Sequence, residues 1–265
     1  MKEYWNDHWQ EIFSANKLDS FDAIWNLDTE WFEEPNQRRG GWSGVIKVNL
    51  DTKEGKNGVF IKRQENHITK TWLHPIKGIL TFEREFENIL QMQNRDLPVM
   101  ETVFFAQRNI DNKRQAILIT KELTDYISLD SERFLPSGDL IKNVSHKKQL
   151  LIAVADAVRS IHSHHFEHNC LYLKHIFVKP VGDSWDVKLI DLEKLKWRVF
   201  KRKAVFRDLY TLYRHARGWS SKDHVSLFKL YTQEHKLSAK SKKLWREIEA
   251  RILSKVRYPM IDSTK

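Results

Sequence analysis

The stretch EHNCLYLKHIFVK, residues 167–179, decides how the rest of the chain is interpreted. It follows KKQLLIAVADAVRSIHSHH, in which apolar residues recur at the spacing of one helix face. It ends in HIFVK, a short strand-like run. Polar residues between a long helix and a strand are typical of a functional loop. His168 and His175 bracket this loop and lie seven residues apart, a separation that would also suit a pair of metal ligands.

Composition limits the class of protein. The chain has 265 residues, of which 41% are hydrophobic and 12% aromatic, enough to bury a core in one large domain or two lobes. Its formal charge of +10 favours a polyanionic partner such as nucleic acid, a phosphorylated glycolipid or an anionic membrane face. Cys170 is the single cysteine, which excludes an internal disulfide framework and a cysteine-rich zinc site.

The compartment is predicted from what the sequence lacks. The first residues, MKEYWNDHWQEIFSANKLDS, are charged and aromatic and contain no apolar run of signal-peptide length. No later stretch has the long uninterrupted apolar run of a membrane-spanning helix. With a lone cysteine indicating a reducing environment, we expect a cytoplasmic protein that can touch a membrane without spanning it.

The pattern of elements changes once along the chain. The strand-like runs of the first part are WSGVIKVNL, GVFIKRQ, METVFFAQ and RQAILITKEL, which predict a small antiparallel sheet of two hairpins, the second turning at RNIDNK. One helix is inserted among them, TFEREFENILQMQ, with apolar residues at helical spacing. Beyond about residue 135 the pattern is mainly helical, with strand-like runs at HIFVK and DVKLIDLEK and a basic helical end from about Val205. The sequence therefore predicts an α+β fold.

Three features of the first part suit a nucleotide. NQRRGGWSGVIKV contains Gly40, Gly41 and Gly44 after two arginines, Arg38 and Arg39. Glycines there would let backbone amides approach phosphate oxygens, although a hairpin that needs positive φ explains them equally well.

The other two features are a lysine on a strand and an acid on the next helix. Lys62 lies in VFIKR, and Glu85 lies at the edge of the apolar face of the helix that follows. Glu83 and Glu87 are its competitors and are expected to be solvated. An exposed strand lysine is the plain alternative for Lys62.

Two aspartates follow the quoted loop. Asp191 comes directly after the apolar strand of VKLIDLEKLKW, and Asp208 opens the amphipathic segment FRDLYTLYRHA. A turn-capping aspartate and a helix N-terminal acid are the ordinary alternatives for these residues.

The order of these motifs resembles the protein-kinase fold, and more closely the bacterial lipopolysaccharide kinase family of the InaA and WaaP type, with the Kdo kinases. The resemblance covers nearly all the chain after about residue 36. It implies a two-lobed protein-kinase-like fold, in which residues 1–123 form a nucleotide-binding N-lobe of antiparallel sheet with one helix. Residues 124–265 form a mainly helical C-lobe with the catalytic loop, metal site and acceptor site.

The resemblance also implies ATP and Mg²⁺ as cofactors and gives residues their roles. The residues assigned to nucleotide binding are Gly40, Gly41, Gly44, Lys62, Glu85 and Leu123. In this pattern Lys62 binds the α and β phosphates, Thr120 lies behind the nucleotide, and the backbone of Lys121 to Leu123 lies beside the adenine. Asp208 would bond to the backbone of the catalytic loop.

The kinase loop H-R-D-x-x-x-x-N corresponds to His168, Asn169, Cys170 and, after four residues, His175. The residues assigned to catalysis are Cys170, His168, Lys62 and Asp191, and those assigned to the metal are Asp191 and His175. WaaP-like members resemble HRDCYICH here, so the second histidine fits the family. Imidazole is nevertheless a poor match for Mg²⁺, so His175 would alternatively hold the loop or the phosphates.

Cys170 departs from the pattern, because it replaces the aspartate that accepts the proton of the substrate hydroxyl. A thiol with an ordinary pKa of about 8.5 accepts protons sparingly near neutrality. Glu167 is a candidate substitute base. The alternative for Cys170 is a small buried residue in a repurposed loop.

The segment KLKWRVFKRKAVFR, residues 194–207, interleaves cations with aromatic residues and would face the acceptor in a kinase-like fold. It suits a phosphorylated sugar on a lipid anchor at a membrane surface, and also RNA or a solvated basic face. We therefore expect ATP-dependent phosphorylation of a heptose or Kdo hydroxyl in the lipopolysaccharide inner core, at the inner face of the inner membrane. The alternatives are an inactive, nucleotide-binding pseudokinase with a stress-response or regulatory role and a nucleic-acid-binding protein.

Overall fold

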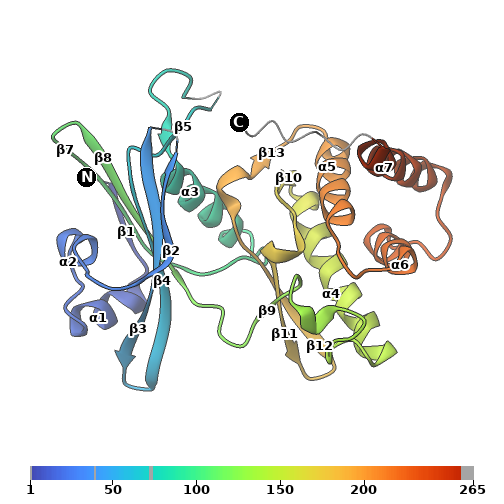
Figure 1. Ribbon diagram of the computed structural model, residues 1–265, viewed down its shortest axis with the longest axis horizontal. Helices are drawn as coiled ribbons and strands as arrows, with labels where there is room; N and C mark the ends of the chain where they lie inside the picture. Colours follow the sequence, from blue (N-terminus) through green and yellow to red (C-terminus); the bar gives the residue numbers. More distant parts are fainter. Residues whose placement is uncertain (1, 39, 72–73, 258–265) are drawn as a thin grey trace. The chain divides into compact units, whose positions relative to one another are not determined.

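The structure is a computed structural model that describes residues 2–38, 40–71 and 74–257. The chain divides into two compact units, Met1–Thr124 and Asp125–Lys265 (Figure 1). Unit 1 contains β1 (Lys2–Trp5), α1 (Asp7–Ala15), α2 (Phe21–Trp25), β2 (Trp31–Arg38), β3 (Gly41–Thr52), β4 (Gly55–Glu65), β5 (Ile68–Thr69), β6 (Ile79–Leu80), α3 (Thr81–Gln93), β7 (Thr102–Ile110) and β8 (Lys113–Lys121).

Unit 2 is richer in helix. Its elements are β9 (Ile127–Ser128), the 3-10 turn η1 (Glu132–Phe134), α4 (Val144–Ser163), β10 (Phe166–Glu167), η2 (Leu173–His175), β11 (Ile176–Val181), β12 (Ser184–Leu189), η3 (Leu192–Lys194), β13 (Lys196–Trp197), α5 (Lys201–Arg214), α6 (Ser221–Thr232) and α7 (Ala239–Arg257). Across the described residues, none of the helices has the length and apolar character needed to traverse a bilayer. The predicted α+β fold is confirmed.

A six-stranded antiparallel sheet forms the frame of unit 1, in the order β1-β7-β8-β4-β3-β2. Both predicted hairpins are present. The β3–β4 hairpin turns at Gly55, whose φ is 124°, and the β7–β8 hairpin turns at Asp111 and Asn112, whose φ values are also positive. Asparagine and aspartate tolerate this conformation better than most residues, as the sequence of that turn predicts.

One face of the sheet carries the core of unit 1. Ile46, Ile61 and Ile119 are adjacent across β3, β4 and β8, since directly paired residues of neighbouring strands share a face. Helices α1 and α2 complete the same buried cluster with Trp9, Phe13, Phe21 and Ile24. The sequence analysis missed both helices, because polar residues separate the few apolar positions of this charged segment.

Helix α3 lies on the opposite face. Its Phe86 ring stacks on Phe105 of β7 with ring centroids 4.3 Å apart. Its N-terminus has no side-chain cap from Leu80, but the Phe82 amide donates to the side-chain carbonyl of Gln64 in β4 at 2.8 Å. This bond satisfies one of the free amides of the first helical turn. The helix is therefore fixed on the Gln64 face of the sheet.

Unit 2 is organised around α4, the long helix that the sequence predicts. Asn143 caps it by accepting from the amides of Ser145 and His146. The predicted apolar stripe is buried: Leu150, Leu151, Val154, Val158 and Ile161. Helix α4 packs against α6 and β12, and the predicted hairpin of β11 and β12 is present. Helix α5 begins at Lys201, before the predicted position near Val205, so it includes part of the basic segment.

Substitution of Gly41 by alanine is expected to destabilise unit 1 by about 3 kcal/mol. A Cβ at Gly41 would lie 2.0 Å from the carbonyl oxygen of Glu65, a backbone atom that can move only if the β3–β4 pairing is disturbed. The matched control is Gly40→Ala, where φ is 81° and no atom found among the described residues lies within 4 Å of the added Cβ, so the cost is about 1 kcal/mol of backbone strain. Urea unfolding measures both variants, and equal midpoints would contradict this account.

Candidate functional site

In unit 1, Lys62 of β4 and Glu85 of α3 form a close ion pair. Lys62 Nζ lies 2.6 Å from Glu85 Oε1, and the two side chains are 19% and 3% exposed. A pair so shielded from water is weakly screened by salt. It therefore holds the ammonium group of Lys62 in a defined place.

The other two acids of α3 have a different partner. Glu83 and Glu87 contact the ammonium of Lys2 in β1 at 3.3 and 2.7 Å, and Glu83 also accepts from Gln107. The expectation that Glu83 is solvated is wrong, because the unpredicted strand β1 places Lys2 beside it. Of these three acids, Glu85 is the one that reaches Lys62.

The glycines at the start of β3 have separate structural reasons. Gly40 needs its left-handed φ of 81°, whereas Gly41 is required by the close approach of the β4 backbone. Of these two glycines, Gly40 is the one beside which the described residues leave room for another group. Arg38 ends β2 and is exposed, and Arg39 lies outside the described residues.

Gly44 faces the core side of the sheet. It pairs with Arg63, whereas its neighbour Val45 pairs with Lys62, so Gly44 and Lys62 lie on opposite faces. A Cβ at Gly44 would lie 2.7 Å from the Trp31 ring, over which the Arg63 guanidinium sits at 4.6 Å. Packing within unit 1 therefore accounts for Gly44, and its assignment to nucleotide binding is corrected.

The end of β8 was assigned to the adenine. Thr120 is buried. The amides of Lys121 and Glu122 already donate to the carbonyls of Glu101 and Gly58, at 3.0 and 2.9 Å. Among the described residues, no carbonyl accepts from the Leu123 amide. Of the three backbone positions, Leu123 therefore keeps a donor for a ligand.

In unit 2, the predicted loop is anchored by Asp208, a buried residue in the middle of α5. Its Oδ2 accepts from the His168 amide at 2.7 Å and its Oδ1 accepts from the Asn169 amide at 2.8 Å. His162 of α4 adds a third bond from Nε2 to Oδ2 at 3.0 Å, and Tyr231 lies 2.9 Å from its Nδ1. Asp208 is thus no helix N-terminal acid, and the bond to the loop backbone that the resemblance implies is present.

The imidazole of His168 is fully buried. Its Nε2 lies 3.0 Å from the carbonyl oxygen of Ile190, and since a carbonyl only accepts, Nε2 carries the proton. Burial lowers the pKa of His168, so the ring is neutral near pH 7. The assignment of His168 to catalysis is corrected: from this position it joins the loop to the strand before Asp191 and positions both.

Cys170 lies beside a cation. Its side chain is buried, with 7% of the residue exposed, and burial raises the pKa of the thiol above its ordinary value. The positive charge of Lys194 in η3 lowers the pKa of the thiol and so opposes this shift in part. The thiol is therefore neutral near pH 7 and is poorly suited to accept a proton.

His175 and Asp191 face each other. His175 Nδ1 donates to the Cys170 carbonyl at 2.8 Å, which leaves Nε2 directed at Asp191 Oδ2, 3.3 Å away. Burial lowers the pKa of His175 although Asp191 opposes the shift, so Nε2 presents a lone pair to the carboxylate. Two acceptors held so close favour a cation between or beside them.

The backbone of Asp191 is itself unusual. Its φ is 59°, in the left-handed region, and its side chain is 33% exposed. Non-glycine residues held in this conformation occur often at ligand-binding positions. Among the described residues, no group of three or more acidic, histidine or cysteine side chains is arranged to hold a metal.

Glu167 does not meet the expectation of a substitute base. It is buried, and Arg198 binds both of its carboxylate oxygens, with Nε to Oε2 at 2.7 Å and Nη2 to Oε1 at 3.0 Å. A bidentate pair of this kind occupies both carboxylate oxygens, so Glu167 is not available to accept a proton from an acceptor.

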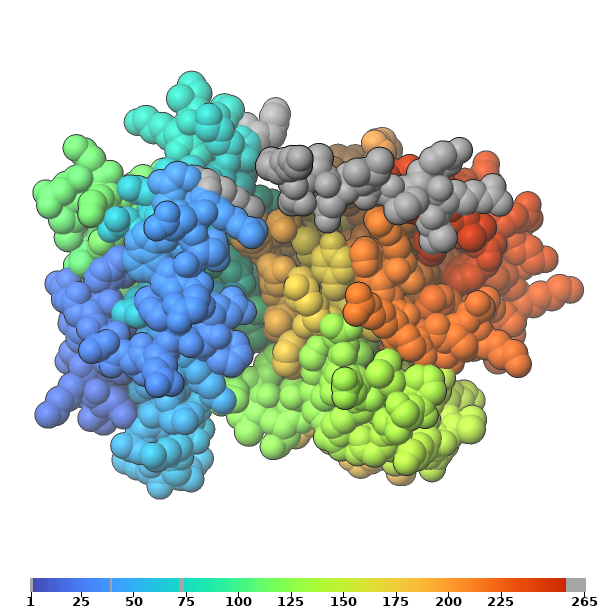
Figure 2. Space-filling view, viewed as in Figure 1, coloured from blue at the N-terminus to red at the C-terminus, as the bar shows by residue number. Residues whose placement is uncertain are grey.

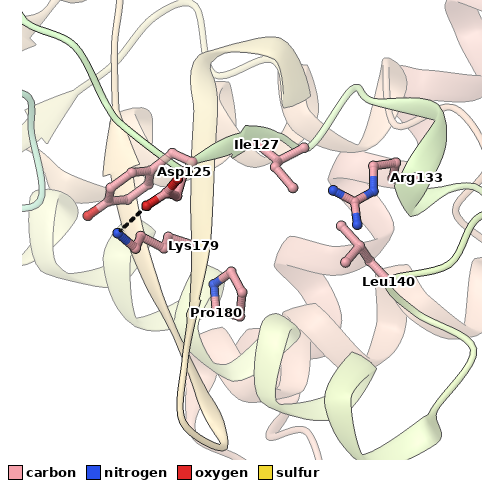
Figure 3. Close-up of a pocket in the computed structure, with 7 residues that line it drawn as sticks. Asp125, Ile127, Arg133, Leu140, Lys179 and Pro180 are labelled. Atoms are coloured by element: carbon pink, nitrogen blue, oxygen red, sulfur yellow. Dashed lines mark hydrogen bonds and ion pairs between the residues drawn. The ribbon is translucent and has the colours of Figure 1, made fainter. Parts of the chain in front are cut away.

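Unit 2 also contains an open cavity of about 460 Å³ (Figure 3). The residues that line it are Asp125, Tyr126, Ile127, Arg133, Leu140, Lys179 and Pro180. Its cations are already paired, Lys179 with Asp125 at 3.1 Å and Arg133 with Asp139 at 2.6 Å. None of the residues assigned from the sequence lines this cavity, so we assign it no ligand.

Comparison with known proteins decides the family. The model of the lipopolysaccharide kinase (Kdo/WaaP) family matches residues 22–231. The chain belongs to this family. It is 30% identical over 200 residues to "Protein InaA" of Escherichia coli (strain K12), across 74% of this chain and 88% of that protein. The resemblance seen in the sequence is confirmed, and membership supports a phosphotransferase.

A solved structure agrees with the fold. "WaaP in complex with acyl carrier protein" matches with a TM-score of 0.67, covering 97% of this chain and 98% of that one. The sequence identity is 18%, so this likeness concerns the fold alone.

Three interactions around the loop were not evident from the sequence. Lys194 and Arg198 belong to the segment expected to face the acceptor, yet Arg198 binds Glu167 and the charge of Lys194 acts on the Cys170 thiol. No short-range pattern indicates these contacts. The burial of His162 could have been predicted, because it is a polar residue directly after Ile161 of the apolar stripe of α4.

Cys170 is expected to react slowly with iodoacetamide in the folded protein. Burial limits access and raises the pKa of the thiol, so the rate should still rise above about pH 9.5, where an ordinary thiol with a pKa of about 8.5 is almost fully ionised. Because Cys170 is the single cysteine, mass spectrometry follows it directly, and the urea-unfolded chain is the control. Equal rates in the folded and unfolded chains near neutral pH would show an accessible, activated thiolate instead.

Proposed function

We propose that this protein is an ATP-dependent kinase that phosphorylates a sugar hydroxyl of the lipopolysaccharide inner core, on heptose or Kdo. The observation that carries the proposal is Asp191, a partly exposed carboxylate in a left-handed backbone conformation, next to a loop held by Asp208. Family membership supports the reaction class, and the phosphoryl donor and the acceptor sugar are parts of the proposal.

The residues of unit 2 fit a magnesium ion in part. Magnesium is commonly held by one or two carboxylates, while phosphate oxygens and water complete its octahedron. Asp191 offers a carboxylate of this kind. His175 offers nitrogen, which magnesium binds poorly, so we assign His175 to fixing the loop through the Cys170 carbonyl. Bound ATP would supply the γ-phosphoryl group, and the metal would neutralise charge on its oxygens.

The residues of unit 1 fit the phosphates of a nucleotide. Lys62 presents an ammonium group that Glu85 holds in place, and we assign it to the α and β phosphates. Gly40 leaves its backbone open to a ligand, and Leu123 retains an amide for the base. Gly41 and Gly44 have no part in this assignment, because contacts within the sheet explain them.

The loop itself changes the charge next to the acceptor. In the kinase pattern a carboxylate stands where this chain has the neutral thiol of Cys170 with the ammonium of Lys194 beside it. Phosphoryl transfer depends chiefly on positioning and charge neutralisation, so the reaction proceeds without a strong base at this position. A cation here also suits an acceptor sugar that already carries a phosphate.

A pseudokinase is the second candidate, favoured by the same replacement of aspartate by Cys170. It would retain nucleotide binding through Lys62 and Asp191 and transfer no phosphate. Its role would then be regulatory.

Asp191→Ala is expected to lower phosphate transfer by at least about 100-fold, because the metal loses its carboxylate ligand. The assay mixes purified protein, Mg²⁺, ATP and deacylated core oligosaccharide, and mass spectrometry scores the acceptor phosphate. Asp183→Ala, at an exposed aspartate between β11 and β12, is the matched control and should retain activity. If the unaltered protein forms no product while ATP analogues raise its Tm, the kinase proposal fails and the pseudokinase stands.

Cys170→Asp is expected to keep or raise the transfer rate. Lys194 would stabilise the charge of the new carboxylate, which could accept the proton of the acceptor hydroxyl. Cys170→Ala should remain close to the unaltered protein, because a neutral thiol contributes little as a base. The readout is kcat in the same oligosaccharide assay. A collapse of activity in both variants would show that the thiol has a role of its own.

A further inference from the structure

Three neighbouring apolar side chains are unusually exposed in unit 2. Trp197, Val199 and Phe200 are 60%, 64% and 68% exposed and lie at the end of β13 and in the link that leads to α5. Figure 2 shows orange atoms, from the part of the chain around α5, at the surface of the face in view. A folded protein gains by burying such groups, so a cluster of them marks a surface for a partner.

Cations surround this cluster. Lys196, Lys201, Arg202 and Lys203 are exposed, and residues 194–207 contain seven basic residues and no acidic one. Arg202 also contacts Glu247 of α7. We call residues 196–203 the basic apolar segment. Its partner has to accept apolar side chains and carry negative charge close to them.

The basic apolar segment is held firmly at its beginning. β13 pairs with β10, with Trp197 opposite Phe166 and Lys196 opposite Glu167. The Arg198 amide donates to the His165 carbonyl at 2.8 Å, and the His165 ring stacks on Trp197 with centroids 5.6 Å apart. Little conformational freedom remains to be lost when a partner binds.

We propose that the basic apolar segment docks on an anionic lipid bilayer. Trp197, Val199 and Phe200 would enter the boundary between headgroups and acyl chains, while the lysines remain among the headgroups. Aromatic side chains favour this level of a membrane, and each cation near anionic lipid adds to the attraction.

The side chains favour lipid over RNA. Single-stranded nucleic acid binds by stacking bases on flat aromatic faces. Here Val199 is aliphatic, and the imidazole of His165 already stacks on the Trp197 ring. A bilayer accepts aliphatic and aromatic groups alike, so all three exposed side chains would contact it.

Docking would also bring the catalytic loop close to the membrane. β10 leads directly into His168, so a bilayer bound at β13 lies one strand away from the loop. This consequence rests on the proposed kinase function, because it brings the loop to an acceptor anchored in the same membrane. Lipid binding itself does not depend on phosphate transfer.

Vesicle binding tests the proposal. The unaltered protein should co-sediment with vesicles of phosphatidylcholine containing one third phosphatidylglycerol, and much less with pure phosphatidylcholine. Trp197→Ser with Phe200→Ser should reduce the bound fraction at least about tenfold. The matched control is Ile76→Ser with Val144→Ser, which removes apolar residues of 84% and 83% exposure elsewhere. It should bind as the unaltered protein does.

Further measurements keep folding, lipid binding and activity distinct. The Tm of each double variant, and its increase with an ATP analogue, should match those of the unaltered protein, so that lost binding is not lost folding. The lipid proposal is overturned if the unaltered protein ignores anionic vesicles, or if both double variants still bind them equally. It is also overturned if the Trp197 and Phe200 variant loses binding to single-stranded RNA while its binding to vesicles is unchanged. Vesicle binding without phosphate transfer would contradict the kinase proposal and leave the lipid proposal standing.

Discussion

A carboxylate buried from water is stable only where donors surround it, and Asp208 receives three of them. Two are backbone amides of the loop and the third is the imidazole of His162 on α4. One side chain of α5 thus fixes the path of the loop and its spacing from α4. The left-handed conformation of Asn169, with φ of 65°, is retained because these bonds hold its own amide and the amide of the residue before it.

Given this anchor, the loop keeps a kinase-like course while its chemistry differs. His168 and His175 each bind a backbone carbonyl, one before Asp191 and one within the loop. Both rings therefore hold the loop in place, and in each ring the nitrogen that bonds to the carbonyl carries the proton. The changed position, Cys170, is neutral and sits beside Lys194, so the local charge is more positive than an aspartate would make it.

Much of the fold follows from periodicity. The two hairpins of unit 1, α3 and α4 were predicted because their apolar residues follow a period of two or of helical spacing over long runs. The N-terminal helices were missed because their burial depends on a few large aromatic residues among charges.

The site was less predictable than the fold. The choice of Glu85 followed from its position at the edge of an apolar helix face, which is local information. The burial of Glu167 against Arg198, and the approach of Lys194 to Cys170, depend on where distant segments meet. Gly44 is a further example of a residue whose role could not be predicted. Glycine is needed there because the Trp31 ring packs against it, and Trp31 lies on a strand that was not predicted from the sequence.

The short strand β1 has a consequence for handling the protein. It pairs with β7 along Lys2 to Trp5 and lies before residue 22, where the family match begins. A chain shortened to the matched segment would leave the amides and carbonyls of β7 unpaired at a sheet edge. Such an edge pairs readily with another molecule. β1 is itself the edge of the sheet, but with four residues it presents a shorter edge than the nine residues of β7, which limits self-association.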